Sequence, residues 1–237
     1  MHGPDGPMNR YAVYFAPAVG SPWWDFGAGW LGRDELRDAP LAQPAVPGFD
    51  AGQLAQLTGE PRRYGFHATL KAPFRLREGA TETQLRDRLR LLAGRLRRLP
   101  LGGLVPRHME GFVALVPARA PPGLDALAAQ CVTDLDGLRA PLTEAEIARR
   151  QPRRLDARGR ELLAAHGYPH VLERFRFHMT LSGLVDAATA ARLMVHLPPA
   201  LDRLDTGHPL LLDRLCLFGE PRPGAAFVRL HEEELAP

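Results

Sequence analysis

Two short stretches of the chain alternate apolar and polar residues with the two-residue period of a β-strand. Residues 65–74 read GFHATLKAPF, and residues 177–183 read FHMTLSG. In each stretch a His and a Thr fall on one face, and the aromatic and aliphatic residues around them fall on the other. A strand with one apolar and one polar face packs one side on a core and leaves the other side open. The pattern therefore predicts two strands that line a shared cleft.

The two stretches are copies of one motif, His-x-Thr, placed 111 residues apart. With 9 His in 237 residues, composition alone predicts fewer than one such tripeptide. Both copies also have a Phe before the His and a Leu after the Thr. We therefore take His67, Thr69, His178 and Thr180 as the candidate catalytic residues, against the alternative of two unrelated core histidines.

The remaining pattern predicts an α+β fold. Strands are expected over residues 10–16, 101–106, 111–117, 210–218 and 225–231, and helices over 23–30, 51–58, 81–96, 123–139, 144–165 and 187–195, with a Pro-containing loop after the last helix. The order motif strand, helix, strand, turn, strand occurs twice, which indicates two lobes related by a pseudo-twofold axis. Their antiparallel sheets would line a central cleft, with helices outside.

In domain terms, we expect a disordered tail followed by a single two-lobed catalytic domain. The tail covers residues 1–9 and the domain residues 10–237, with motif lobes around 62–117 and 172–231 and a helical connection around 120–168.

Two segments outside the motifs leave alternatives open. Residues 21–50 contain all three Trp, which either cap a pocket or pack beneath a loop. Residues 144–165 are rich in Arg and interrupted by Pro152. Such a run is usually a solvated face, but its arginines would meet anionic ligands if the segment closed over the cleft: Arg149, Arg150, Arg153 and Arg154.

The composition is that of an ordinary globular protein, with 45% hydrophobic and 24% charged residues. Cys131 and Cys216 lack metal-ligand spacing, so two reduced, buried thiols are expected. No apolar run suits a signal peptide or a bilayer, so we expect a cytoplasmic protein without a membrane partner, and a monomer is favoured. The net charge of +3 suits a small phosphorylated substrate better than a long polyanion.

Strand parity points to three further contacts with the substrate. Lys71 is the one Lys among 30 basic residues and lies two positions after Thr69, where an ammonium and a guanidinium would not be interchangeable. Ser182 follows Thr180 with the same spacing, and Tyr14 falls on the face of the 10–16 strand that borders the cleft. Lys71, Ser182 and Tyr14 are therefore candidate substrate-binding residues.

The motif residues suit phosphodiester cleavage. Imidazole exists in both protonation states near neutral pH, so one His can act as base and the other as acid. The Thr hydroxyls can donate hydrogen bonds to phosphoryl oxygens and stabilise their growing charge. Two His without a nearby carboxylate or third His are a poor ligand set for zinc or iron. We therefore expect no metal and no cofactor.

The paired FHATL and FHMTL motifs resemble the twin signature of the 2H phosphoesterase superfamily, which includes RNA 2′,3′-cyclic phosphodiesterases and ligase-like proteins. A narrower similarity, to a bacterial branch described as phosphonate-metabolism proteins, extends over residues 10–17, 30–34, 63–74, 111–117 and 174–181. The resemblance implies a two-lobed fold of antiparallel sheets and helices, with catalytic roles for His67, Thr69, His178 and Thr180.

The resemblance also implies an activity: metal-independent hydrolysis of a small cyclic phosphate of a sugar or nucleotide, in phosphonate breakdown. The long middle helices, 123–139 and 144–165, depart from the shorter RNA-processing members, so RNA is the less favoured substrate. Two alternatives stay open, namely processing of RNA ends by the same mechanism and non-catalytic binding of a phosphorylated ligand.

Overall fold

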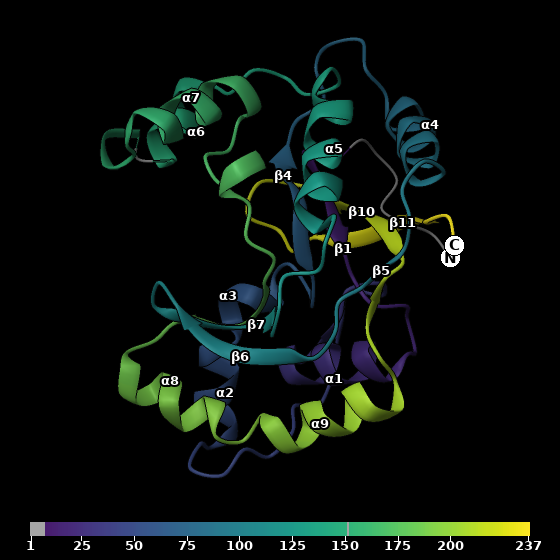
Figure 1. Cartoon of the computed structure of the whole chain (residues 1–237). Coiled ribbons are helices and arrows are strands. Elements are labelled where there is room, and N and C mark those ends of the chain that lie inside the picture. Colours follow the sequence, from purple (N-terminus) through teal and green to yellow (C-terminus); the bar gives the residue numbers. More distant parts are fainter. Residues whose placement is uncertain (1–7, 151) are drawn as a thin grey trace.

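The computed structural model describes residues 8–150 and 152–237. Within them, seven strands form one antiparallel sheet in the order β11-β10-β1-β4-β8-β7-β6, which confirms the α+β class. Figure 1 shows this sheet in the middle of the molecule, with helices above and below it. Its strands are β1 (Arg10–Phe15), β4 (Ala68–Phe74), β6 (Leu104–Met109), β7 (Phe112–Pro117), β8 (Met179–Leu184), β10 (Arg214–Glu220) and β11 (Val228–Glu234). Short antiparallel pairs join β2 (Arg33–Asp34) to β3 (Ala39–Pro40) and β5 (Leu99–Pro100) to β9 (Leu211–Leu212).

The helices cover the two halves of the sheet. The half with β4, β10 and β11 packs against α4 (Glu82–Ala93) and α5 (Leu124–Asp136). The half with β6, β7 and β8 packs against α1 (Pro22–Leu31), α2 (Ala51–Leu57), α3 (Gly59–Arg62), α8 (Ala187–Met194) and α9 (Pro198–Gly207). A further segment stands apart at the upper left of Figure 1 and contains α6 (Glu144–Arg149), η1 (Pro152–Arg154) and α7 (Ala157–His166), followed in the chain by η2 (Leu172–Arg174).

The two repeats are interleaved in space, which corrects the lobe boundaries expected around 62–117 and 172–231. The hairpin β6–β7 comes from the first repeat but pairs with β8, the motif strand of the second. Conversely, β10 and β11 come from the second repeat but lie beside β1 and β4. Each motif strand therefore lies in a half of the sheet whose outer strands come from the other repeat. The sequence order of the repeats could be predicted, but their pairing depends on long-range contacts.

Three further expectations differ from the structure. The expected loop after α8 contains α9, which begins with Pro198 at its first turn. The expected helix over 144–165 is divided into α6, η1 and α7, because proline does not fit a helix interior. Of the expected tail, residues 1–7 lie outside the described residues, whereas Met8 is buried and the Asn9 backbone donates to Glu220. In the described residues, no helix is long and apolar enough to cross a membrane.

The three tryptophans pack inside the protein and do not cap a pocket. Helix α1 begins after Ser21, whose hydroxyl accepts from the Trp24 backbone, and it buries Trp23, Trp24 and Trp30. The indole of Trp30 donates to the carbonyl oxygen of Leu181 in β8 at 2.9 Å. Helix α1 therefore supports the second motif strand from the core side.

Each face of the sheet has its own apolar cluster. The main core gathers the inward faces of the strands and most helices. A smaller cluster on the other face contains Ala12, Tyr14, Ala16, Cys216, Phe218 and Phe227. Both cysteines, Cys131 and Cys216, are free and buried, as expected. The second face holds the motif side chains.

Candidate active site

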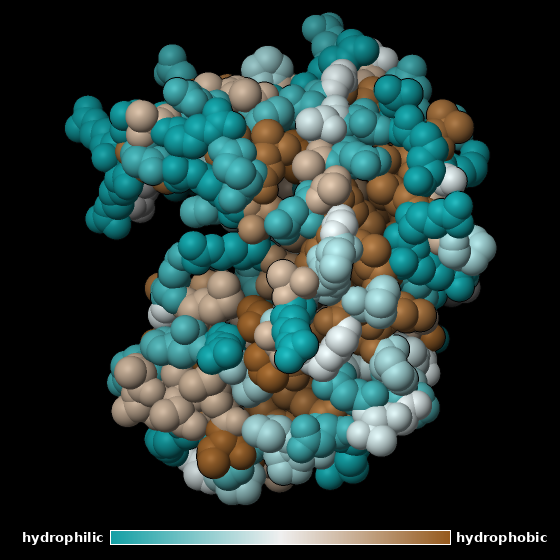
Figure 2. Space-filling view, viewed as in Figure 1, coloured by the Kyte–Doolittle hydropathy of each residue, from teal (hydrophilic) through white to brown (hydrophobic). Residues whose placement is uncertain are grey.

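A cleft of about 520 Å³ contains both His-x-Thr motifs. Figure 2 shows a hollow on the left of the molecule, between the α6–α7 segment and the half of the sheet covered by α8. The residues that line the cleft include His67, Thr69, His178, Thr180, Tyr14, Ser182, Arg10, Arg63, Tyr64, Arg149, Arg150 and Tyr168. An adjoining hollow of about 490 Å³ shares Thr69 and His178 with it. The fold thus brings together the four side chains that the repeated motif singled out.

The register of β4 and β8 brings the motifs side by side. The middle residues of the motifs, Ala68 and Met179, pair in antiparallel register and are buried. Continuing this register by one residue in each direction places the His of each motif opposite the Thr of the other. Residues opposite each other share a face, with Cβ atoms roughly 4.5–5.5 Å apart. The four polar side chains therefore form a compact group with approximate twofold symmetry.

Both imidazoles are held by the same hydrogen bond. His67 Nδ1 lies 2.9 Å from the carbonyl oxygen of Gly65, and His178 Nδ1 lies 2.8 Å from that of Arg176. A carbonyl oxygen only accepts, so Nδ1 of each ring carries a proton and donates it. In the neutral ring the lone pair then lies on Nε2, and in His67 this atom is 3.3 Å from the hydroxyl oxygen of Thr69. Each ring is oriented to use Nε2 for proton transfer.

The surroundings of the two imidazoles differ. Burial lowers the pKa of His67 to about 4, an effect only partly offset by its hydrogen bond to Gly65, and a positive charge on His178 lowers it further. Burial also lowers the pKa of His178, but its bond to the Arg176 carbonyl and the charge of Glu110 both oppose that shift. The surroundings of His67 therefore favour the neutral form of the ring more strongly than those of His178 do.

Aromatic rings fix both histidines. The ring of Tyr14 lies 3.9 Å from that of His67, and the ring of Phe112 lies 5.6 Å from that of His178, between centroids. Tyr14 pairs with Thr69 across β1 and β4, so its predicted place beside the cleft agrees with the structure. Burial raises the pKa of the Tyr14 phenol well above its ordinary value, which keeps it protonated.

Lys71 does not line this cleft, which corrects its expected place there. Its side chain is 3% exposed, and the ammonium donates to Asp136 Oδ1 and to the carbonyl oxygen of Val132, both at 3.0 Å. Both acceptors belong to α5. Lys71 therefore joins β4 to the helix that covers it.

A bulge explains why strand parity failed at this position. Thr69 pairs with Tyr14, but Lys71 pairs with Val13, so two residues of β4 are matched by one of β1. Adjacent residues of β1 point to opposite faces. Lys71 is therefore turned to the face opposite that of Thr69.

Ser182 lies at the wall of the cleft, but its hydroxyl is engaged within the sheet. It accepts from the Val113 backbone and donates to the carbonyl oxygen of Gly183, both at 2.9 Å. The side chain is 1% exposed. The structure therefore gives Ser182 a role in joining β8 to β7.

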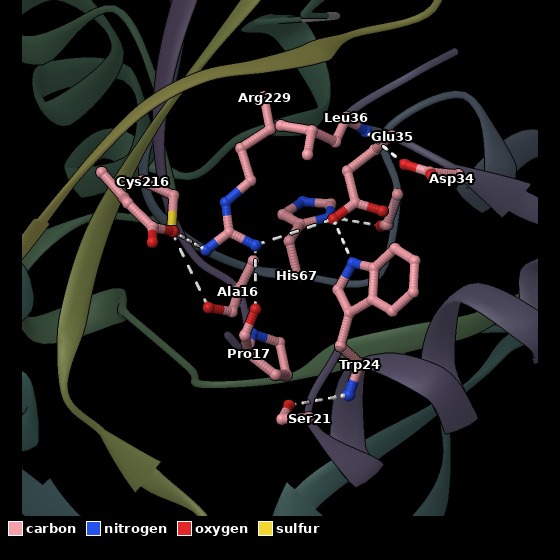
Figure 3. A network of polar contacts seen from close by, with 12 residues as sticks. Ala16, Pro17, Ser21, Trp24, Asp34, Glu35, Leu36, His67, Cys216 and Arg229 are labelled. Atoms are coloured by element: carbon pink, nitrogen blue, oxygen red, sulfur yellow. Dashed lines mark hydrogen bonds and ion pairs between the residues drawn. The ribbon is translucent and has the colours of Figure 1, made fainter. Parts of the chain in front are cut away.

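A buried polar network supports the turn before His67. Glu35 accepts from the Trp24 indole at 2.8 Å and lies 3.8 Å from the guanidinium of Arg229. Its side chain packs against Gly65, which has a φ of +78° and where a Cβ would come within 3.0 Å of Glu35. Figure 3 shows this network beside His67. Because the Gly65 carbonyl orients the imidazole, the network also fixes the ring of His67.

Sequence reasoning missed Arg63, Tyr64 and Tyr168 in the cleft, because they lie in segments without a period. Arg10 also lines the cleft, on the β1 face shared with Tyr14 that alternation predicted to border it. Of the arginines in the Arg-rich segment, Arg149 and Arg150 line the cleft. Among the described residues, no group of three His, Cys, Asp or Glu side chains is placed to hold a metal ion.

Residues 69–228 match the family described as "Protein of unknown function (DUF1045)". Two relatives carry the name "Ribose 1,5-bisphosphate phosphokinase PhnN". The protein from Janthinobacterium sp. (strain Marseille) is 40% identical over 228 residues, which cover 93% of this chain and 49% of the relative. The protein from Laribacter hongkongensis (strain HLHK9) is 39% identical over 224 residues, which cover 92% of this chain and 50% of the relative. The chain thus spans about half the length of these relatives.

Two solved structures were also compared with the chain. E. coli LigT complexed with 3′-AMP aligns at 16% identity with a TM-score of 0.43, covering 98% of this chain and all of LigT. A crystal structure described as a phosphoesterase aligns at 16% identity with a TM-score of 0.44 and the same coverage.

Proposed function

The chain belongs to the DUF1045 family, and we propose that it is a phosphodiesterase that hydrolyses a small cyclic phosphate. One observation carries the proposal: two histidines, each bound through Nδ1 to a backbone carbonyl, share one cleft and a sheet register with two threonines. Two imidazoles and two hydroxyls around one cavity supply a base, an acid and two hydrogen-bond donors. These groups suit the hydrolysis of a phosphodiester.

The reaction is a single displacement at phosphorus. Nε2 of one histidine takes a proton from water, whose oxygen forms the new bond to phosphorus. The ester bond of the cyclic phosphate breaks, and Nε2–H of the other histidine donates its proton to the departing sugar oxygen. The product is a phosphate monoester with a free hydroxyl, and proton exchange with solvent restores both rings.

The surroundings favour one division of the two roles. His67 has the lower pKa because burial favours its neutral form, which suits the base. His178 lies near Glu110, whose charge favours the protonated ring, which suits the acid. We therefore assign the base to His67 and the acid to His178. The bound phosphoryl group, being anionic, would raise both pKa values toward neutrality.

Thr69 and Thr180 stabilise the phosphoryl group. A hydroxyl donates one hydrogen bond, and the two threonines lie on the same face of neighbouring strands. Donors fixed on strands need little reorganisation as negative charge grows on the non-bridging oxygens. In this mechanism the protein's own side chains perform each step, without a metal or another cofactor.

The proposed substrate is a cyclic phosphate of ribose or of a nucleotide. The two relatives are named for ribose 1,5-bisphosphate, a sugar phosphate of the class that opening a ribosyl cyclic phosphate would produce. Phosphonate breakdown is the setting that the family resemblance implies. The kinase activity in those names belongs to proteins about twice as long as this chain. A phosphate-binding loop of the kinase type needs a Gly-rich loop ending in Lys, and the one Lys in this sequence, Lys71, is buried against Asp136.

A substrate screen in excess EDTA tests the proposal. Nucleoside 2′,3′-cyclic phosphates, ribosyl cyclic phosphates and RNA ending in a 2′,3′-cyclic phosphate would be compared, with the double variant His67→Ala/His178→Ala controlling for contaminating activity. We expect hydrolysis of the small substrates, slower reaction of the RNA and none with the variant. Faster reaction of the RNA would favour RNA-end processing, and binding without turnover would favour a ligand-binding protein. Loss of activity in EDTA with recovery in zinc or manganese would contradict the two-histidine mechanism.

A further inference from the structure

One end of the cleft has more positive charge than the protein neutralises. Arg10, Arg63 and Arg150 line it together with the phenols of Tyr64 and Tyr168. Guanidinium groups are always charged in proteins and form forked hydrogen bonds to carboxylates and phosphates. The carboxylates that pair with these three arginines therefore show how much positive charge is left for a ligand to neutralise.

Arg10 and Arg63 share one carboxylate. Glu220 is fully buried and accepts from Arg10 Nε at 2.5 Å, from Arg10 Nη2 at 2.9 Å and from Arg63 Nη2. It also accepts from Asn9 at 2.8 Å and from the Gly224 backbone at 3.0 Å. Two cations against one anion leave a unit of positive charge. The side chains of Arg10 and Arg63 are 21% and 28% exposed, so a ligand in the cleft can reach them.

Arg150 adds a second unit of unneutralised positive charge. In the part of the chain that the structure describes, no carboxylate forms an ion pair with it. Glu146 also lines the cleft, but it is bound to Arg75 at 3.0 Å and to Thr143. The Arg150 guanidinium instead lies over the ring of Tyr168, 4.8 Å from its centroid. Burial lowers the pKa of this guanidinium and the charge of Arg10 lowers it further, whereas the charge of Glu146 opposes that shift. Arg10 and Arg150 therefore lie within electrostatic reach of each other.

This charged end is linked to the reacting end by Tyr64. The Tyr64 ring lies 6.0 Å from that of His67, and its hydroxyl accepts from Arg63 Nη1 at 3.0 Å. The Arg63 guanidinium also lies 5.0 Å from the centroid of the same ring. A small molecule with its reacting phosphate at His67 can therefore extend along Tyr64 to the arginines.

Glu60 and Arg149 also line the cleft. They carry one charge of each sign, so together they do not change the net charge of the cleft.

We propose that Arg10, Arg63 and Arg150 form a subsite for a second phosphate group, a terminal phosphate monoester at the end of the substrate distant from the cyclic phosphate. The inference rests on the proposed function and narrows it to substrates with two phosphates. A monoester carries nearly two negative charges at neutral pH, which match the two unneutralised positive charges. An internal phosphodiester of RNA carries one charge and continues as a chain, so it fits the subsite less well.

Binding measurements separate this subsite from catalysis. The probes are adenosine 3′-phosphate and adenosine 3′,5′-bisphosphate, titrated calorimetrically into the whole protein at fixed salt. The wild type is expected to bind the bisphosphate at least tenfold more tightly, because the second phosphate gains charge-assisted hydrogen bonds. Arg150→Met should reduce the preference for the bisphosphate over the monophosphate at least tenfold. It should change the affinity for the monophosphate less than twofold. Arg150→Lys should retain part of the preference, because the charge stays but the fork is lost.

The matched control is Arg88→Met, which removes the same charge from an exposed position on α4 outside the cleft lining. It should bind both probes as the wild type does. The inference is overturned if the wild type binds the probes equally or binds neither, or if Arg150→Met weakens both by the same factor. Failure of the proposed function would appear differently, as no hydrolysis of adenosine 2′,3′-cyclic phosphate 5′-phosphate, which carries both phosphate groups, by a protein that keeps its preference for the bisphosphate.

Discussion

The two His-x-Thr motifs have the same hydrogen bonds but different surroundings. In both, Nδ1 of the imidazole is bound to the carbonyl oxygen two residues earlier, and the residue between His and Thr is buried in the sheet. His67, however, lies near two phenol rings, those of Tyr14 and Tyr64. His178 lies near the charge of Glu110. The repeat thus supplies two similarly oriented imidazoles, and their environments differ in how strongly each favours the neutral form of the ring.

The comparison extends to the positions after the motifs. Lys71 and Ser182 both lie two residues after the Thr, and both are engaged inside the protein, one with α5 and the other with β7. Neither side chain is free for the substrate in the structure. In the proposed mechanism the reacting part of the repeat is therefore limited to His and Thr, and the following polar residue fixes the strand to a neighbouring element.

The largest expected effect is that of removing either imidazole. His67→Ala and His178→Ala should each lower kcat by roughly 10² to 10⁴, the usual contribution of a positioned base or acid. The double variant should lose much less than the product of the two losses, because both groups act in one step. His208→Ala, at an exposed histidine outside the cleft, is the control. Steady-state rates of the folded variants test this prediction. A near-native rate in either single variant would refute a mechanism in which both histidines take part.

A smaller loss is expected when the hydroxyls are removed. Thr69→Val and Thr180→Val keep the size and branching of the side chain but lose the donor, and each should lower the rate by roughly 10 to 10³. Because charge on the phosphoryl oxygens grows toward the transition state, the loss should appear in kcat more than in KM. Equal losses would indicate a phosphoryl group placed symmetrically between the motifs. Losses confined to KM would show that the hydroxyls only bind the substrate.

The smallest effect on catalysis is expected at Lys71. Lys71→Met should leave kcat/KM within about twofold of the wild type, because the ammonium points to α5. The same change should lower the free energy of unfolding by about 1–3 kcal/mol, because Asp136 and the Val132 carbonyl lose a buried donor. Denaturant unfolding and kinetics on the same sample measure both quantities. Unchanged stability together with a tenfold loss of activity would contradict this placement and indicate that Lys71 contacts the substrate.

The sequence predicted the motif strands and the four motif side chains because period-2 alternation and a repeated His-x-Thr pattern can be read from the order of residues alone. Helices α1, α4 and α5 were predicted from their apolar spacing for the same reason. Helix α9 was missed because its prolines indicated a loop, although proline suits the first turn of a helix. The face of Lys71 was wrong because a bulge in β4 cannot be read from alternation.

Arg150 was one of the arginines considered for contact with an anionic ligand, but its grouping with Arg10 and Arg63 could not be predicted because the three come from distant parts of the chain. Arg10, Arg63 and Glu220 meet only when β10 pairs with β1 and the turn before β4 folds over them. The register that places each His opposite the other motif's Thr likewise depends on β4 pairing with β8. The sequence therefore indicates which residues react, whereas long-range pairing determines how they are arranged.

The pH dependence of kcat/KM, measured for the wild type and both single variants, tests the division of labour most directly. The free enzyme should be active with His67 neutral and His178 protonated, so the rate should rise as His67 loses its proton, with a pKa of about 4. It should fall as His178 loses its proton at a pKa below the ordinary value of about 6.5. The residual activity of His67→Ala should lack the acidic limb, and that of His178→Ala the alkaline limb. Both limbs persisting in either variant, or the limbs exchanged between them, would contradict the assignment of base and acid.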